Sequence, residues 1–196
     1  MIILWILFSY LLGAFPTGYL VYMISEKQDI RKFGSGNIGA TNVLRLLGWK
    51  KAIPVIFTDI LKGALPTLAA LYALPDKKWA MACGFAAIVG HCFPVYLKFR
   101  GGKGMATTIG VYAVLDIPVL LIMLGIFFVV IALTRYVSLG TLLAAFSFPA
   151  ASFLIRDEIT LVSLGSAVFL IIAFQHRSNI QRLIKGRERK LGEKPS

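Results

Sequence analysis

The way this chain would cross a membrane depends on residues 104–134, which read GMATTIGVYAVLDIPVLLIMLGIFFVVIALT. The stretch is apolar apart from Asp116, and as one helix it would be about 45 Å long at 1.5 Å per residue. That exceeds a hydrocarbon core of about 30 Å unless the helix tilts severely. Asp116-Ile117-Pro118 provides a break, because the residue before a proline is pushed out of the α region. We therefore expect a short helix at 104–115 and a longer one at 117–134.

The rest of the chain also consists largely of apolar runs. Hydrophobic residues make up 58% of its 196 residues, far more than in a soluble domain of this size. The N-terminal run has no preceding cation and no small-residue cleavage site, so we expect it to be kept as a span. We predict an all-α polytopic membrane protein with one domain over 1–196 and seven transmembrane helices. The spans are expected at 2–24, 52–74, 78–97, 104–115, 117–134, 139–155 and 159–176.

The charge distribution favours seven spans over six. The net charge is +12, and its cations border apolar runs, which indicates membrane topology and anionic headgroups rather than nucleic acid. With seven spans, only Lys77, Lys78 and Arg156 lie on one face and all other cations between or after the spans lie on the opposite face. With six, Arg135 and the basic tail would change sides. The positive-inside rule then predicts an outside N-terminus and a cytoplasmic C-terminus.

Two glycine-rich segments interrupt the apolar runs on the expected cytoplasmic side. They read GSGNIGATN at 34–42 and RGGKG at 100–104. Their backbone N–H groups are unobstructed by side chains, and Arg45 and Lys103 supply positive charge, a combination typical of a phosphate cradle. Asn37 or Thr41 is expected to cap the helix that follows the first segment, with Arg45 one turn beyond Thr41. The alternatives are an ordinary interfacial loop with a snorkelling arginine and a flexible turn, and GGKG alone is a weak signal without Walker A spacing.

The residues after the last span add a third polar group. His176, Asn179 and Arg182 are spaced three apart and would share one helix face. A basic membrane exit explains the arginine, whereas a histidine at that depth can accept a proton or donate a hydrogen bond to phosphate. Ser138, at the start of another span, is interpreted as a cap of the following helix, which is the usual role of such a serine.

Other polar residues within the spans are interpreted structurally. Asp59 and Lys62 are three apart inside one span and are expected to pair with each other. His91 near a helix end is more simply structural than catalytic, and Cys83 and Cys92 are interpreted as packing residues. The two histidines and nine scattered carboxylates form no metal-ligand pattern, and there is no G-x-S-x-G motif.

Three stretches resemble the signature regions of a known family. SGNIGATNVLR at 35–45, GHCFPVYLKFRGGKGMAT at 90–107 and HRSNIQR at 176–182 are similar to those of the bacterial acyl-phosphate:glycerol-3-phosphate acyltransferases, the PlsY family. The resemblance implies a seven-helix enzyme of phospholipid biosynthesis in the bacterial inner membrane, with its active site facing the cytoplasm. It implies transfer of an acyl group from acyl phosphate to the 1-hydroxyl of glycerol 3-phosphate, giving lysophosphatidate and phosphate. It also implies no metal, no CoA and no other cofactor, and it sets no oligomeric state.

The same resemblance assigns site residues. An acyl phosphate is already activated, so no covalent acyl-enzyme is expected, and catalysis can come from positioning and charge stabilisation. The hydroxyl proton passes either to His176 or to the substrate's own phosphate, and the resemblance favours the phosphate. The expected catalytic residues are Ser35, Arg45, Lys103, His176 and Asn179. The expected phosphate-binding residues are Ser35, Gly36, Asn37, Thr41, Arg45, Gly101, Gly102, Lys103, Gly104, Ser138, His176 and Asn179.

A transporter or channel for a phosphorylated anion is the competing function. Such proteins usually contain internal repeats and broken helices at matching positions near the membrane midplane. This sequence has no recognisable repeat, and its polar groups gather at one expected face. The enzyme is therefore the favoured interpretation.

Overall fold

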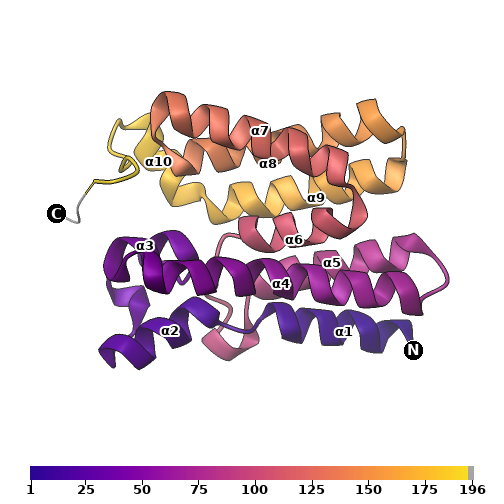
Figure 1. Ribbon diagram of the computed structural model, residues 1–196, viewed down its shortest axis with the longest axis horizontal. Helices are drawn as coiled ribbons and strands as arrows, with labels where there is room; N and C mark the ends of the chain where they lie inside the picture. The colour runs from indigo at the N-terminus through magenta and orange to yellow at the C-terminus, as the bar shows by residue number, and fades with distance from the viewer. Residues whose placement is uncertain (194–196) are drawn as a thin grey trace. The chain divides into compact units, whose positions relative to one another are not determined.

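The computed structural model describes residues 1–193, and every regular element in that range is a helix (Figure 1). Within this range the helices form two compact units, residues 1–114 and residues 115–193. The first contains α1 (Ile2–Gly13), α2 (Thr17–Glu26), η1 (Ile30–Lys32), α3 (Ala40–Leu47), α4 (Trp49–Ala73), α5 (Lys77–Cys92), η2 (Val95–Leu97) and nearly all of α6 (Met105–Leu115). The second contains α7 (Ile117–Thr134), α8 (Val137–Arg156), α9 (Ile159–Gln175) and α10 (Arg177–Ile184). The all-helical prediction is confirmed, and the single domain over 1–196 stays a prediction.

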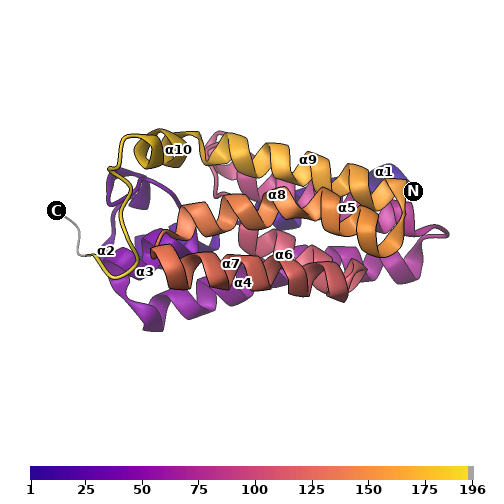
Figure 2. The ribbon, with the colours of Figure 1, turned by 90° about the horizontal axis from the view of Figure 1, so that it is seen from above.

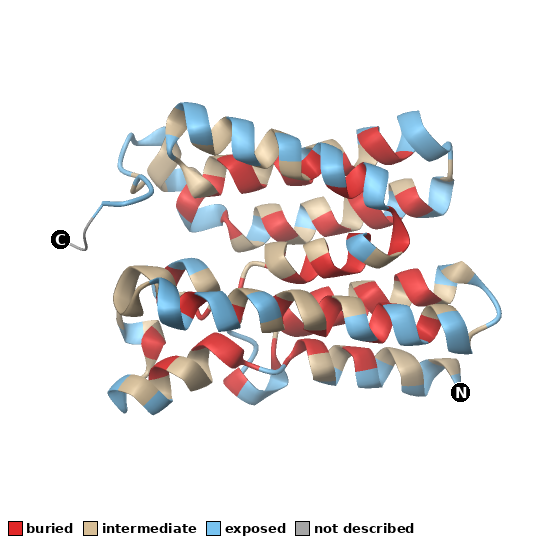
Figure 3. Ribbon diagram, in the orientation of Figure 1, coloured by how far each residue is buried: buried red, intermediate tan, exposed pale blue. Residues whose placement is uncertain are grey.

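Helix α5 forms the centre of the first unit. It contacts both α1 and α4, and much of it is coloured as buried in Figure 3. The backbones of α1 and α5 approach closely at two glycines: a Cβ at Gly13 would lie 2.1 Å from the Ala87 carbonyl oxygen, and one at Gly90 would lie 2.2 Å from that of Tyr10. Small residues at such crossings are typical of helix packing in membranes, because van der Waals contact is the main attraction there.

Helix α6 is short and packs tightly against α4 within the first unit. A Cβ at Gly63 of α4 would lie 2.2 Å from the Thr107 carbonyl oxygen, and one at Gly110 of α6 would lie 2.0 Å from that of Ile60. The Thr107 and Tyr112 side chains are fully buried. An 11-residue helix is too short to cross a hydrocarbon core. The polar backbone at its ends cannot be exposed to lipid, so the helix has to be surrounded by protein, as this packing provides.

The first predicted span, 2–24, is not one continuous helix. Helix α1 ends at Gly13 and α2 begins at Thr17, so the expectation of a single helix was wrong. Pro16 lies between them, and proline both lacks an N–H and clashes with the carbonyl one turn earlier. At the break, the Phe15 carbonyl is outside the regular helices and finds a hydrogen-bond partner within the protein, because it accepts from Lys62 Nζ at 3.1 Å.

The break at Asp116 is confirmed and has a clear cause. Asp116 is the N-cap of α7: one carboxylate oxygen accepts a hydrogen bond from the Val119 N–H at 3.0 Å, and the other accepts one from Arg156 Nε. The carboxylate is buried, while the Arg156 side chain is partly exposed at the end of α8. The cap and the ion pair together fix where α7 begins.

The second unit is built on a row of three helices. α8 contacts α7 on one side and α9 on the other, as Figure 2 shows, and its Phe148 side chain is fully buried. Large apolar side chains such as Leu121, Phe128 and Leu154 are exposed. An outer surface of this kind suits contact with lipid rather than water.

The number of spans is confirmed only in part. Among residues 1–193, five segments are long and apolar enough to cross a membrane: Ile2–Glu26, Trp49–Ala73, Lys77–Leu97, Ile117–Thr134 and Val137–Arg156. A sixth is obtained if α9 and α10, which are bent by 65° relative to each other, are counted together. Helix α6 is apolar but shorter. The count of seven and the orientation of the termini stay predictions.

Candidate functional site

The first glycine-rich segment is held in place by one buried side chain, that of Asn42. Its Oδ1 accepts a hydrogen bond from the Ser35 N–H at 2.9 Å. Its Nδ2 donates to the carbonyl oxygens of Phe33 at 3.1 Å and Asn37 at 2.9 Å. Asn42 is 1% exposed, so these bonds are shielded from water. The segment is therefore a fixed loop that leaves Ser35 exposed, rather than a mobile linker.

Two glycines of this loop adopt a backbone conformation that other residues rarely take. Gly34 has φ +61° and Gly36 has φ +71°, both in the left-handed region. A Cβ at Gly34 would also lie 2.3 Å from the Asn42 Oδ1. The glycines thus allow the tight path that Asn42 stabilises.

The helix that follows the loop is not capped as expected. The N-cap of α3 is Gly39, which has no side chain, and neither Asn37 nor Thr41 takes that position. The Asn37 Oδ1 instead accepts a hydrogen bond from the Gly39 N–H at 2.8 Å, and Thr41 is exposed on the first turn. Gly39 therefore offers no side chain to the first-turn amides of α3, which is the arrangement that suits an anion. Arg45 lies one turn beyond Thr41 on α3, half-buried.

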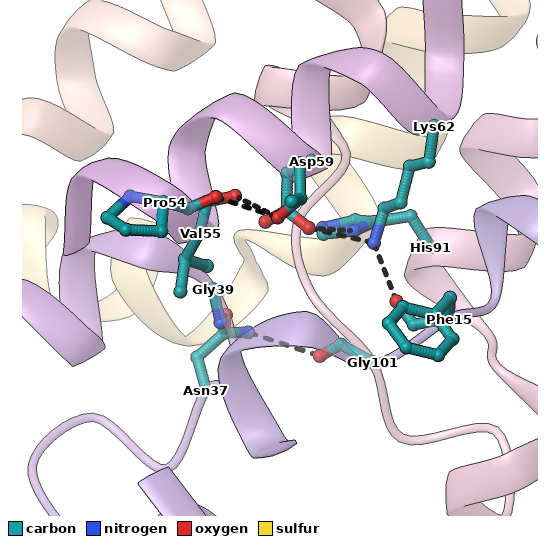
Figure 4. A network of polar contacts seen from close by, with 10 residues as sticks. Phe15, Asn37, Gly39, Pro54, Val55, Asp59, Lys62, His91 and Gly101 are labelled. Atoms are coloured by element: carbon teal, nitrogen blue, oxygen red, sulfur yellow. Dashed lines mark hydrogen bonds and ion pairs between the residues drawn. The ribbon is translucent and has the colours of Figure 1, made fainter. Parts of the chain in front are cut away.

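A hydrogen bond from Asn37 joins the two glycine-rich segments. Its Nδ2 donates to the Gly101 carbonyl oxygen at 3.3 Å, as the dashed line in Figure 4 marks. Residues 34–39 and 101–104 therefore lie side by side in the first unit, although more than 60 residues separate them in the sequence. The structure thus brings the loop with Ser35, Gly36 and Asn37 next to the segment that carries Lys103, while Thr41 and Arg45 lie on the helix that follows the loop.

The second segment lies directly against His91 at the end of α5. The Gly102 N–H donates a hydrogen bond to the His91 carbonyl oxygen at 3.0 Å. A Cβ at Gly101 would lie 2.2 Å from that oxygen, and one at Gly102 would lie 2.0 Å from the His91 Nε2. The segment ends at Gly104, with φ +86°, immediately before α6 begins. Half-buried Lys103 therefore stands at the N-terminal end of a helix, where the backbone favours anions.

A buried ion pair lies behind this segment. The Lys62 Nζ is 2.8 Å from the Asp59 Oδ1, which confirms the pairing expected from their spacing. The His91 Nδ1 is 3.7 Å from the same carboxylate oxygen. All three side chains are buried, and Figure 4 shows them gathered beside Phe15.

In the second unit, Glu188 holds the polar residues of the third motif. The Ser138 hydroxyl and the Asn179 Nδ2 both donate to its Oε1, at 2.8 and 2.5 Å, and the Arg182 Nε donates to its Oε2 at 2.7 Å. Ser138 does not cap α8, whose N-cap is Tyr136. Buried His176 forms the junction of α9 and α10, with its Nδ1 2.8 Å from the Ile172 carbonyl oxygen.

Glu188 is ionised more readily than an ordinary glutamate. Burial alone would raise its pKa, but the hydrogen bonds from Asn179, Arg182 and Ser138 outweigh burial, and the net pKa is lowered from 4.5. Sequence reasoning missed this residue. The only signal was a carboxylate between two arginines, Arg187 and Arg189, in a tail that is mostly basic.

Comparison with known proteins shows the family to which the chain belongs. The glycerol-3-phosphate acyltransferase family model matches residues 3–186. A protein of Thermoanaerobacter pseudethanolicus, named glycerol-3-phosphate acyltransferase, is 44% identical over 95% of this chain and 93% of its own length. Proteins with the same name from Prochlorococcus marinus (strain NATL1A) and Staphylococcus aureus (strain Newman) are each 42% identical, covering 95% and 97% of this chain and 96% and 98% of their own.

Two solved structures share the fold. Both are crystal structures of PlsY, described as an integral membrane glycerol 3-phosphate acyltransferase. The glycerol 3-phosphate form has a TM-score of 0.92 at 35% identity, covering 97% of this chain and 96% of that one. The lysophosphatidic acid form has a TM-score of 0.89 at 34% identity, covering 97% and 95%. With the family match over nearly its whole length, the chain belongs to the PlsY family of integral membrane glycerol-3-phosphate acyltransferases.

Proposed function

We propose that the protein transfers a fatty acyl group from acyl phosphate to the 1-hydroxyl of glycerol 3-phosphate, at the cytoplasmic face of the bacterial inner membrane. The products are lysophosphatidate and inorganic phosphate. One observation carries the proposal: in a member of this family, two glycine-rich loops with nearby cations are joined by the Asn37–Gly101 hydrogen bond. The excess of cations on one expected face supports seven spans with an outside N-terminus.

The cations reduce the electrostatic repulsion between the two negatively charged substrates of this reaction. Both substrates carry phosphate groups, and their negative charges repel each other as the reacting atoms approach. At an effective dielectric of about 20, two unit charges 4 Å apart interact by about 4 kcal/mol, so each cation offsets a large part of that repulsion. We assign phosphate holding to Arg45 and Lys103. Phosphate binding is also assigned to Ser35, Gly36, Asn37, Thr41, Gly101, Gly102, Gly104, Ser138, His176 and Asn179.

The chemistry requires no residue to become acylated. The 1-hydroxyl oxygen attacks the acyl carbon, forming the new C–O bond and a tetrahedral oxyanion. The bond from that carbon to the phosphate oxygen then breaks, and phosphate leaves with the electron pair. The hydroxyl proton passes to a substrate phosphate oxygen, which leaves His176 as a binding group. Positioning and stabilisation of the oxyanion by N–H donors and cations provide the rate acceleration.

The first prediction concerns the acyl donor and the side of the membrane. In inside-out vesicles that contain the protein, acyl phosphate and glycerol 3-phosphate should yield lysophosphatidate and phosphate, with and without EDTA. In right-side-out vesicles, external glycerol 3-phosphate should not be acylated, because the charged substrate does not cross the bilayer. Acyl-CoA is the rival donor. Acylation from acyl-CoA alone, or uptake of glycerol 3-phosphate into proteoliposomes without product, would contradict the proposal.

The second prediction concerns the cradle cations. Arg45→Ala and Lys103→Ala should each lower kcat/KM by at least about 100-fold, the usual effect of removing a charge or donor from a transition-state site. Lys50→Ala is the matched control, because Lys50 is an exposed cation at the start of α4. It should retain near-normal turnover. If all three variants lose activity equally, general surface charge rather than a cradle is responsible.

The third prediction concerns Glu188 and pH. Its folded-state pKa is lowered from 4.5, so the carboxylate stabilises the fold above that pH and the stabilisation is lost as pH falls through the folded pKa. In Glu188→Gln, an amide group faces the Arg182 guanidinium, so the variant should melt at lower temperature near pH 7. The gap in Tm from the wild type should close as pH drops below 4.5.

Glu193→Gln is the control for that measurement. Glu193 is an exposed carboxylate of the same tail, and it accepts a hydrogen bond from the Lys190 N–H at 2.9 Å. Its substitution should leave the melting curve almost unchanged at every pH. A Glu188→Gln gap that does not vary with pH would show that the charge of Glu188 is not what stabilises this region.

A further inference from the structure

Three segments of the first unit meet at the buried Asp59, Lys62 and His91 side chains. These are 3%, 6% and 4% exposed, respectively. Lys62 contacts both the Asp59 carboxylate and the Phe15 carbonyl at the break between α1 and α2. The backbone and ring of His91 contact the second glycine-rich segment. Figure 4 shows this cluster with the Asn37–Gly101 bond nearby.

Gly102 packs directly against the imidazole ring of His91. The three atoms nearest to a Cβ at Gly102 all belong to this ring: Nε2 at 2.0 Å, Cε1 at 2.6 Å and Cδ2 at 2.9 Å. Real Cβ atoms do not come this close to neighbouring atoms, so only glycine fits while the ring stays in place. At Gly101 the close atoms are different: the carbonyl oxygens of His91 and Cys92 and the Pro94 ring.

The other side of the ring faces the ion pair. The His91 Nδ1 is 3.7 Å from the Asp59 Oδ1, beyond hydrogen-bond length but in contact. Lys62 lies 2.8 Å from the same oxygen and is itself held by the Phe15 carbonyl. The ring is thus enclosed by Gly102 on one side and by a buried, charge-compensated pair on the other.

We propose that His91 is a positioning residue, fixed by the Asp59–Lys62 pair, which sets the path of the Gly101–Gly102 backbone and thereby the placement of Lys103. The inference rests on the proposed function, because Lys103 and its neighbours are assigned there to phosphate binding. The ring faces protein on both sides, so its effect on the reaction passes through the loop. The break between α1 and α2 belongs to the same cluster, because Lys62 bonds both to the Phe15 carbonyl at the break and to Asp59 beside the His91 ring.

The test is a double-mutant cycle between His91 and Gly102. Gly102→Ala should lower kcat/KM for glycerol 3-phosphate at least about 100-fold, because the new methyl group meets the ring. His91→Ala removes all three clashing atoms. It should raise KM for glycerol 3-phosphate more than it lowers kcat, because the cradle loses its fixed shape. The double variant should recover at least about tenfold in kcat/KM over Gly102→Ala, which is about 1.4 kcal/mol, and the coupling energy exceeds this by the cost of His91→Ala alone.

Gly101→Ala is the matched control. Its Cβ would meet backbone oxygens and Pro94, which His91→Ala leaves in place. It should therefore be as damaging in the His91→Ala background as in the wild type. Equal recovery at both glycines, or no recovery at Gly102, would overturn the proposal.

A second readout does not depend on activity. Lys98 and Arg100 are exposed at the start of this segment, so trypsin cleavage after them reports how well the loop is held. Cleavage should be faster in Gly102→Ala than in wild type and slower again in the double variant, while that in Gly101→Ala should stay fast in both backgrounds. If wild type acylates nothing, the proposed function fails, yet the cleavage pattern still decides whether His91 positions the loop. Unchanged cleavage in Gly102→Ala would refute that contact.

Discussion

Backbone that is neither helical nor exposed to water must find hydrogen-bond partners inside the protein, and this requirement governs the first unit. Where α1 breaks, the Phe15 carbonyl is bonded by Lys62. In the first glycine-rich loop, Asn42 bonds three backbone groups, and in the second, Gly102 donates to the His91 carbonyl. The side chains of Lys62 and Asn42 and the carbonyl of His91 thus supply partners for backbone that lies outside the long helices. The irregular segments can therefore persist beside apolar helices.

This arrangement leaves the loops pre-organised. The Asn42 side chain and the His91 carbonyl bond to protein backbone, whereas Ser35 is exposed and α3 begins without a side-chain cap. Donors that are already fixed cost no reorganisation when charge develops on a reacting oxygen. Some residues therefore hold the loops in place while others face the ligand. The proposed transfer between two phosphorylated substrates requires such fixed donors.

Local sequence signals predicted a helix break and an ion pair within one helix, but they did not predict contacts between residues that are far apart in the sequence. The α6–α7 break followed from Asp116 and Pro118, and the Asp59–Lys62 pair from its spacing on one helix. Pro16 gave the same kind of signal for α1, but the apolar composition of 2–24 masked it. The roles of Asn42 and Glu188 depend on folding partners that no spacing rule specifies. Gly39 as the N-cap of α3 was missed because Asn and Thr stood nearby as better candidates.

Amide hydrogen exchange with and without glycerol 3-phosphate tests the central claim, that the two joined glycine-rich loops form one phosphate-binding cradle. The account predicts slower exchange on ligand addition in residues 34–42 and in residues 100–105 together. Exchange in residues 76–82 at the α4–α5 connection should stay unchanged and serves as the reference. Protection of only one loop, or of neither while the protein remains able to bind the ligand, would contradict the claim.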